Sequence, residues 1–461
     1  MPKWIPDNAE VEAELLREVG LSSFDELFAD VPKSVRAKRL GLAEGREERA
    51  VVDEVTRILG RNRPLSSFAS FLGGRVVDRY VPAAVDGVLS RSEFYTSYTP
   101  YQPEASQGLL QALFEFQSLW VELTQMEVAN ASLYDGATAA GEAMLMCHRA
   151  HAGQRFLVPA SLPWEERSVL ENYAEGPGIH IAEVPFDGER GALNLARLKE
   201  EVARGDVFGV LIDQPNGLGH LEPAAPEIKR LIGDVPLAVS ADPLSLTVLE
   251  PPGSWGADIV VGEGQGFGAA PSYGGPLLGL FACRRELVRF APGRIVGATV
   301  DAHGRRAYTL TLQTREQHIR RSRATSNICT NQSLLALAFV AYASVVGPRG
   351  LERLQGRISE QARAAADALG RVDGLSAPRF SAPFLGDFTI DVPSIAATEF
   401  LDRLRRRGVL GGVALADPRP GRSGLDPHWI RVSASESTDA TSIRRYERAA
   451  RLALGHSGGV P

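Results

Sequence analysis

The chain has 461 residues, 44% of them hydrophobic, so it is long enough to bury one large core and a smaller one. Its net charge of −6 argues against nucleic acid or an anionic membrane surface as the main partner. No apolar run approaches the roughly 20 residues that a membrane-spanning helix needs, and the acidic N-terminus has no apolar signal segment.

The first 70 residues predict an arm of short helices. Residues 10–19 and 48–59 repeat apolar positions with a helical period, and Ser23–Glu26 has the spacing of a capping box. We therefore expect an N-terminal helical arm over residues 1–70.

Strands and helices alternate between residues 150 and 285. The expected strands are 155–158, 180–184, 207–212, 237–240, 258–261 and 277–281, and the expected helices are 163–175, 194–203 and 226–232. Strands separated by helices of this length are typical of a parallel sheet covered on both faces. The sequence therefore predicts a large α/β domain over residues 71–335.

A different pattern follows the sheet region. The expected helices are 332–346, 351–369, 396–407 and 442–454, and the expected strands are 388–390 and 430–432. These helices and two short strands predict a small C-terminal α+β domain over residues 336–461.

The segment Ser132–Ala143 predicts the start of another helix, with small residues just inside it. A helix N-terminus with bare backbone amides can bind phosphate. However, Asp135 stands where an N-cap carboxylate would occupy the same amides and repel a phosphate dianion. Both an ordinary helix cap and an anion site remain open here.

An acid and a glycine-rich segment occupy positions that matter in pyridoxal-phosphate (PLP) enzymes. Asp242 follows a predicted strand, where an acid could hold the pyridine nitrogen of PLP or simply cap a turn. Further on, where the lysine of a Schiff base is expected, Gly262–Gly268 carries Gln265. The last lysine of the chain is Lys229, and neither an amide nor a guanidinium can replace the missing amine. The sequence predicts the scaffold of a PLP enzyme without its covalent anchor.

The same glycines suggest a competing interpretation. Gly264, Gly266 and Ala269 formally fit the G-x-G-x-x-[G/A] pattern of dinucleotide binding. That pattern must open a helix and be followed by an acid about 20 residues later. Here it runs into Pro271 and further glycines and prolines, which oppose a helix, so NAD binding is the weaker alternative.

Two polar segments are candidates for a binding surface. Tyr95–Glu104 places three tyrosines and a carboxamide between prolines, which suits an interface or a cleft, although a packed loop is the plainer alternative. The charged Thr314–Arg321 is typical of a solvated face. The uncharged Ala324–Gln332 is more typical of a helix cap that also lines a cleft.

The three cysteines, Cys147, Cys283 and Cys329, are scattered and odd in number, which argues against disulfides and a thiolate metal site. Of eight histidines, only His148 and His151 lie close together. We therefore expect no metal and a reducing, cytoplasmic location.

Several long segments together resemble one known family. They are SRSEFYTSYTPYQPEASQG from Ser90 to Gly108, ANASLYDGATAAGEAM, GADIVVGEGQGFG with GGPLLG, and LQTREQHIRRSRATSNICTNQ. They resemble the glycine dehydrogenase (decarboxylating) family, the P-protein of the glycine cleavage system. The chain is similar to the subunit 1 type, which is encoded separately and corresponds to the N-terminal half of the fused form.

The resemblance implies a fold-type-I, aspartate-aminotransferase-like PLP architecture and an α2β2 assembly with a subunit 2 that carries the PLP-binding lysine. It implies an oxidoreductase that is active only with subunit 2. That enzyme decarboxylates glycine and passes the aminomethyl group to the lipoyl group of H-protein.

The resemblance also implies roles for individual residues. Tyr98, Tyr101, Gln102 and Asn327 would contribute to the partner's site. Gln265 stands at the Schiff-base position, and Asp242 and Thr138 stand at vestigial cofactor positions. Two alternatives remain open: a scaffold or regulatory pseudo-enzyme subunit, and the same subunit pair acting on another amino acid in a specialised pathway.

Overall fold

The computed structural model describes residues 8–37, 41–328, 330–419 and 424–456. The chain divides into two compact units, residues 1–63 and 64–461. The first unit contains α1 (Ala9–Glu18), a 3-10 turn at Phe24–Phe28 and α2 (Glu48–Leu59). Asn8 caps α1 by accepting a hydrogen bond from the Val11 amide. The two helices lie where their apolar period predicted them; the three-part domain division stays a prediction.

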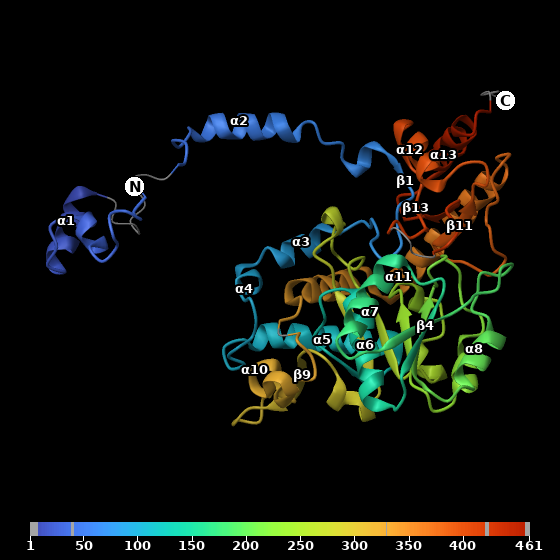
Figure 1. The fold of residues 1–461 in the computed structure, drawn as a ribbon, viewed down its shortest axis with the longest axis horizontal. Helices are drawn as coiled ribbons and strands as arrows, with labels where there is room; N and C mark the ends of the chain where they lie inside the picture. Colours follow the sequence, from blue (N-terminus) through green and yellow to red (C-terminus); the bar gives the residue numbers. More distant parts are fainter. Residues whose placement is uncertain (1–7, 38–40, 329, 420–423, 457–461) are drawn as a thin grey trace. The chain divides into compact units, whose positions relative to one another are not determined.

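A seven-stranded sheet organises the second unit (Figure 1). Its strand order is β2-β8-β7-β6-β5-β3-β4. The strands are β2 (Val128–Ala129), β3 (Arg155–Pro159), β4 (His180–Val184), β5 (Val207–Gln214), β6 (Leu237–Ala241), β7 (Ile259–Glu263) and β8 (Gly279–Cys283). Strands β3 to β7 are parallel, whereas β8 runs antiparallel to β7 and β2 runs antiparallel to β8. The prediction of a mostly parallel sheet is confirmed.

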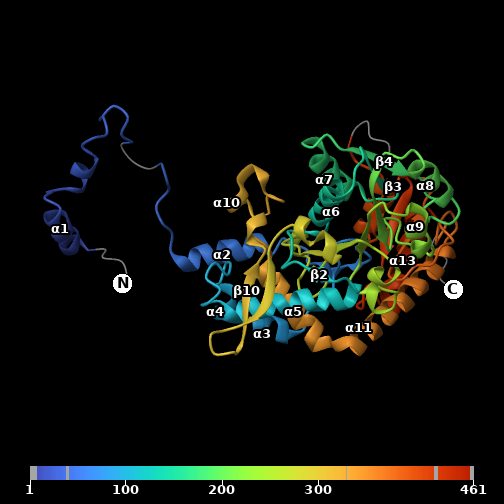
Figure 2. The same ribbon diagram turned by 90° about the horizontal axis from the view of Figure 1, so that it is seen from below.

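Helices cover both faces of this sheet (Figure 2). One face packs against α5 (Gln107–Thr124), α8 (Leu195–Val202) and α9 (Ala225–Ile232), and the other packs against α6 (Gly136–Ala150) and α7 (Trp164–Glu175). From Val210 to Ile212, successive side chains of β5 alternate between these two cores: Val210 and Ile212 join the first, and Leu211 joins the second. Because both faces of the sheet are buried, the central strands are continuous apolar runs in the sequence.

Helix α11 (Ser333–Gly370) links the sheet to the C-terminal part of the chain. It replaces the two expected helices, which join across a break at Gly347 (φ 70°) before Pro348. It is long and apolar enough to cross a membrane by length and composition, so the prediction that no apolar stretch of this kind exists was wrong. Its apolar side chains pack inside the protein: Phe339 is buried in the core of the seven-stranded sheet, and Leu369 is buried in the C-terminal core.

The C-terminal core surrounds a three-stranded antiparallel sheet of order β11-β14-β13. Its elements are β11 (Asp387–Asp391), α12 (Ala397–Arg406), β13 (Val413–Ala414), β14 (Trp429–Ser433) and α13 (Ala440–Ala453). A separate parallel pair joins β1 (Ala69–Ser70) to β12 (Val409–Leu410). The start of the second unit is thereby fastened to its C-terminal core.

The remaining α-helices and β-strands lie in the part of the chain that contains Tyr95–Glu104, which we call the tyrosine-rich segment, and in residues 295–320. They are α3 (Ala83–Leu89), α4 (Ser92–Tyr95), the hairpin of β9 (Ile295–Val300) with β10 (Arg306–Thr311), and α10 (Gln317–Arg320). Cys147 and Cys283 are free and buried, whereas Cys329 lies outside the described residues.

Candidate functional site

Gln265 lies just beyond β7 and is fully buried. Its side-chain Oε1 accepts a hydrogen bond from the Val77 amide (2.9 Å). Its Nε2 donates to the carbonyl oxygens of Val77 (3.1 Å) and Ala269 (2.6 Å). Both N–H groups and the oxygen of this amide are therefore engaged in structural hydrogen bonds, and an amide has no free amine to react with an aldehyde.

Two carboxylates occupy the N-terminus of α6. Asp135 is its N-cap and forms a capping box with Thr138, which confirms the interpretation of Asp135 as an ordinary helix cap. Glu263, at the end of β7, accepts hydrogen bonds from the amides of Gly136 (2.9 Å), Gln265 (2.9 Å) and Leu278 (2.8 Å). A phosphate group would have to displace these carboxylates and overcome their negative charge.

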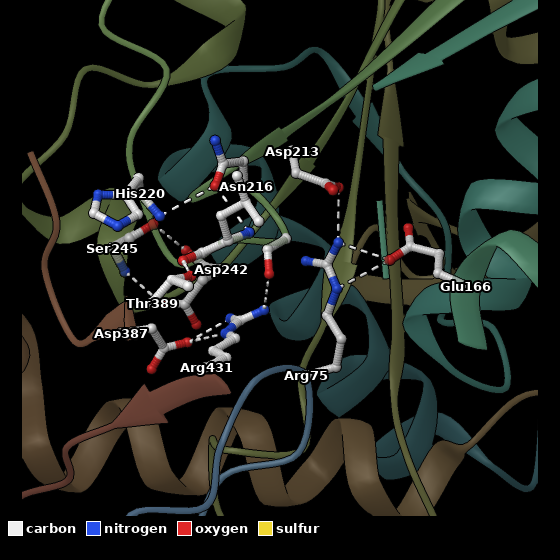
Figure 3. Close-up of polar contacts among 12 residues, drawn as sticks. Arg75, Glu166, Asp213, Asn216, His220, Asp242, Ser245, Asp387, Thr389 and Arg431 are labelled. Atoms are coloured by element: carbon white, nitrogen blue, oxygen red, sulfur yellow. Dashed lines mark hydrogen bonds and ion pairs between the residues drawn. The ribbon is translucent and has the colours of Figure 1, made fainter. Parts of the chain in front are cut away.

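A stretch of chain that we call the inserted segment, Gly73–Tyr80, runs through this part of the molecule. Its Arg75 donates to Glu166 Oε2 (3.0 and 2.7 Å) and to Asp213 Oδ1 (2.7 Å), as Figure 3 shows. At its far end the Tyr80 amide donates to Glu436 Oε1 (2.7 Å). Together with Gln265, these contacts hold the inserted segment across the end of the sheet.

Burial and charge shift the ionisation of these groups. Burial raises the pKa of Glu166 to about 7 against the attraction of Arg75, and it raises the pKa of Glu263 to about 7 against three backbone hydrogen bonds. Burial lowers the pKa of Arg75, but the charges of Glu166 and Asp213 more than compensate and leave it above its ordinary value. The guanidinium therefore stays charged.

The end of the sheet does not fit a bound PLP. Gln265 offers no amine, and the amides at the start of α6 already bind carboxylates. Asp242 caps the turn after β6: its Oδ2 accepts from the Ser245 amide (2.9 Å), and its carbonyl oxygen accepts from the Ser245 hydroxyl (2.7 Å). The assignment of Asp242 and Thr138 to vestigial cofactor positions stays a prediction.

Residues 265–268 form a turn, and the chain leads from there into a 3-10 turn at Ser272–Gly274 rather than an α-helix. The helix that a dinucleotide-binding fingerprint must open is therefore not formed at this position.

A polar cluster that the sequence prediction missed lies beside the inserted segment (Figure 3). Arg431 on β14 donates to Asp387 on β11 and to the Gly217 carbonyl oxygen (3.4 Å). His220 contacts the Ala382 carbonyl oxygen through Nδ1 (2.7 Å), and burial lowers its pKa. These bonds tie the C-terminal core to the loop after β5. The polar run directly after a buried strand, residues 213–220, was the available signal.

The tyrosine-rich segment follows α4 and is open to solvent. The side chains of Tyr98 and Tyr101 are 72% and 68% exposed, and Gln102 is also exposed. Arg294, which is buried, donates to the Thr99 hydroxyl, and its guanidinium carbon lies 5.4 Å from the centre of the Tyr101 ring. The segment therefore presents polar aromatic groups while Arg294 holds the Thr99 hydroxyl and the Tyr101 ring.

Asn327 lies in a different setting. It is exposed at the rim of a hollow that Glu142 on α6 and Tyr173 on α7 also line. Its neighbour Ser326 donates to Glu142 Oε1 (2.7 Å). The structure therefore places Tyr98, Tyr101 and Gln102 in one segment and Asn327 in a second one.

The comparisons with known proteins agree with this architecture. The family model described as glycine cleavage system P-protein matches residues 2–412. The chain is 42% identical over 431 residues to the probable glycine dehydrogenase (decarboxylating) subunit 1 of Desulfitobacterium hafniense, covering 93% of this chain and 94% of that protein. It is 43% identical over 461 residues to the probable subunit 1 of Xanthobacter autotrophicus, covering 98% and 100% of the two chains.

Solved structures give the same result. A crystal structure of glycine decarboxylase (P-protein) of the glycine cleavage system, in inhibitor-bound form, has a TM-score of 0.86 and 38% identity, covering 98% of this chain and 100% of that one. A sphingosine-1-phosphate lyase of Burkholderia pseudomallei, only 13% identical, has a TM-score of 0.65 and shows the shared fold alone, with 93% and 94% of the two chains covered. The fold is that of the fold-type-I PLP enzymes, as the sequence predicted. With its fold, and with sequence similarity over nearly its whole length, the chain belongs to the family of glycine cleavage system P-proteins.

Proposed function

We propose that this chain is subunit 1 of a two-subunit glycine dehydrogenase (decarboxylating) and that the cofactor is held by subunit 2. The observation that carries the proposal is Gln265, whose amide is fully engaged with Val77 and Ala269 in a family whose chemistry depends on PLP. The relatives are named as subunit 1 of the enzyme, which supports a division of labour between two chains.

The proposed reaction is the decarboxylation of glycine and the transfer of the remaining aminomethyl group to the lipoyl group of H-protein. An α2β2 heterotetramer is the proposed assembly. A cytoplasmic location stays a prediction from cysteine usage.

The proposed contribution of this chain is a set of polar groups for the partner's cleft. Tyr98, Tyr101 and Gln102 suit the role because they are exposed and Arg294 restricts their segment before the partner binds. A tyrosine offers a large apolar surface and one polar tip at a low cost in conformational entropy. Asn327 is a weaker candidate because it stands apart from that segment.

The proposal is tested by mixing the purified chain with and without subunit 2 and following glycine-dependent exchange of CO2. We expect activity only from the mixture. Full activity from this chain alone would contradict the proposal, because the chain would then hold its own reactive cofactor.

Variants of the tyrosine-rich segment test its role. We expect Tyr101→Phe and Gln102→Ala to lower turnover by about tenfold or more, the effect of one lost hydrogen bond to a charged group, while the mass of the complex stays unchanged. Tyr273→Phe is a matched control, since Tyr273 is fully exposed in a different loop. Unchanged turnover in both variants would favour the scaffold alternative, and turnover with a different amino acid would favour the specialised-pathway alternative.

A further inference from the structure

The hairpin of β9 and β10 lies beside α5, and two glutamines of that helix bind its outer edges (Figure 2). Gln117 accepts a hydrogen bond from the Val296 amide (2.8 Å) and donates to the Val296 carbonyl oxygen (2.9 Å). Gln107 accepts from the Tyr308 amide (2.8 Å) and donates to the Tyr308 carbonyl oxygen (2.9 Å). Each carboxamide therefore satisfies both backbone groups of one edge residue, as a neighbouring strand would.

These contacts show which backbone groups of β9 point away from β10. In an antiparallel pair, every second residue turns both its N–H and its C=O toward the partner strand, and the residues between turn theirs outward. Since Val296 faces outward, Ala298 and Val300 also face outward. In the part of the chain that the structure describes, no residue forms a hydrogen bond to these outward backbone groups. The outer edge of β9 is therefore unpaired beyond Val296.

This edge lacks the features that protect exposed strands from pairing. Gly297–Val300 contains neither a charge nor a proline, its last three residues are exposed, and Val300 is 66% exposed. The outer edge of β10 differs, because Gln107 covers Tyr308 and the outward-facing Arg306 carries a charge. Charged side chains on an edge discourage the addition of another strand. Of the two edges, that of β9 is the one suited to a further strand.

The surface around this edge is continuous with the tyrosine-rich segment. Arg294, directly before β9, holds the Tyr101 ring of that segment. A hollow of about 770 Å³ is lined by Glu104, at the end of the segment, and by Thr299 and Val300 on β9. Because the tyrosine-rich segment is proposed to face subunit 2, the same partner would lie next to the free edge of β9.

We propose that the outer edge of β9 pairs with an extended strand of subunit 2 and so forms a sheet shared by the two chains. Outward N–H and C=O groups that recur along one edge are satisfied together by the backbone of another strand. A third strand also stabilises a hairpin, since two strands alone are at best marginally stable in water. This inference rests on the proposed function because it needs subunit 2; a second copy of this chain is the rival occupant.

Amide hydrogen exchange of the full chain, with and without subunit 2, tests this pairing. We expect the amides of Ala298 and Val300 to exchange at least about tenfold more slowly in the complex. The amide of Thr309 already faces β9 and is the internal reference, whose exchange should change little. A complex in which Ala298 and Val300 exchange as fast as in the free chain would overturn this inference and leave the proposed function intact.

Two other outcomes would also overturn it. If the two chains formed no complex, both this inference and the proposed function would be wrong. If the amides of Ala298 and Val300 became protected as the concentration of this chain alone was raised, the edge would belong to a second copy.

A pair of proline variants locates the edge that is used. Ala298→Pro removes an outward N–H and places the proline ring on the edge, but it leaves the bonds between β9 and β10 in place. We expect it to raise the dissociation constant for subunit 2 at least about tenfold. Arg306→Pro makes the same change on the opposite edge of the hairpin and should alter that constant less than about twofold.

An Ala298→Pro chain that binds subunit 2 as tightly as the unmodified chain would overturn the proposal. So would an equal loss of affinity in both variants, because the edge of β9 would then have no special part in binding. If Ala298→Pro does not fold, the exchange measurement on the unmodified chain decides the matter.

Discussion

Two hydrogen bonds join the side-chain amide of Gln265 to the backbone of Val77, which lies 188 residues earlier in the chain. A carboxamide can satisfy both backbone groups of Val77 because it carries a donor and an acceptor, whereas a lysine ammonium carries donors only. Gln265 is therefore more than the loss of a lysine: it fastens the inserted segment to the end of β7.

Gln265→Lys should not restore a cofactor site. The Val77 amide would lose its acceptor, which we expect to lower the free energy of unfolding by about 1–3 kcal/mol. With Asp135 and Glu263 still at the start of α6, we also expect no borohydride-reducible adduct with PLP. Urea unfolding and absorbance spectra measure both effects, and Gln111→Lys, on the exposed face of α5, is the control. A reducible adduct with PLP on Gln265→Lys would show that the missing lysine alone prevents the chain from binding the cofactor covalently.

Arg75→Met should be strongly destabilising because it leaves Glu166 and Asp213 buried without a counter-charge. We expect a loss of roughly 3–5 kcal/mol near pH 8, measured by urea unfolding. Burial already raises the pKa of Glu166 to about 7, and removing Arg75 raises it further. A carboxyl whose folded pKa is raised stabilises the fold at low pH and loses that effect as pH rises, so the defect should shrink towards pH 5.

Two further variants test that explanation. Adding Glu166→Gln and Asp213→Asn to Arg75→Met should restore much of the lost stability, since no buried charge then remains. Arg91→Met, which removes an exposed partner of Glu93, should change stability by less than about 0.5 kcal/mol. A triple variant no more stable than Arg75→Met would mean that packing, not charge, sets the cost.

Glu142→Gln should stabilise the protein at alkaline pH. Burial raises the pKa of Glu142 to about 7, and the hydrogen bond from Ser326 opposes this shift only in part. The folded state therefore holds a proton that the unfolded state has released, so its stability falls as pH rises between about 4.5 and 7. A glutamine keeps the hydrogen bond from Ser326 but does not ionise, so the variant does not lose stability as pH rises. We expect its free energy of unfolding to exceed that of the unmodified chain by roughly 2–3 kcal/mol near pH 8 and to differ little near pH 4. Thermal unfolding between about pH 4 and pH 8 measures this difference in stability, with the exposed Glu122→Gln as control. If the stability of Glu142→Gln and that of the unmodified chain changed in parallel with pH, Glu142 would not be the group with the raised pKa.

Arg294→Met should loosen the tyrosine-rich segment. It removes the hydrogen bond to Thr99, the contact with the Tyr101 ring and the ion pair with Glu316 (3.8 Å). We expect faster amide hydrogen exchange in residues 98–102 and, in the complex with subunit 2, turnover lowered by about tenfold. Arg306→Met, on the exposed end of β10, should leave both unchanged. Unaltered exchange in Arg294→Met would show that other contacts hold the segment.

The fold could be predicted from sequence where a local pattern decides the outcome. The apolar runs of β5 and β6 and the cap at Asp135 each belong to one short stretch, and each lies where it was expected. The direction of β8 and the hairpin of β9 and β10 were not predicted, since strand direction depends on how distant segments pair.

The site was less predictable for the same reason. Gly73–Tyr80 reads as an ordinary connection, and the role of Arg75 depends on carboxylates 91 and 138 residues further along. Asp242 could be located at a strand end, but its turn-capping bonds to Ser245 could be seen only in the folded chain.

The pairing of β1 with β12 sets an order of events during synthesis. Ala69 leaves the ribosome long before its partner Val409, so the two strands cannot pair until the C-terminal core is being made. Until then the start of the second unit cannot complete this pairing, and Phe71 next to it, buried in the C-terminal core, has no core to enter. A nascent chain that stalls before residue 409 would leave an unpaired strand edge and an unburied aromatic side chain exposed to chaperones and proteases.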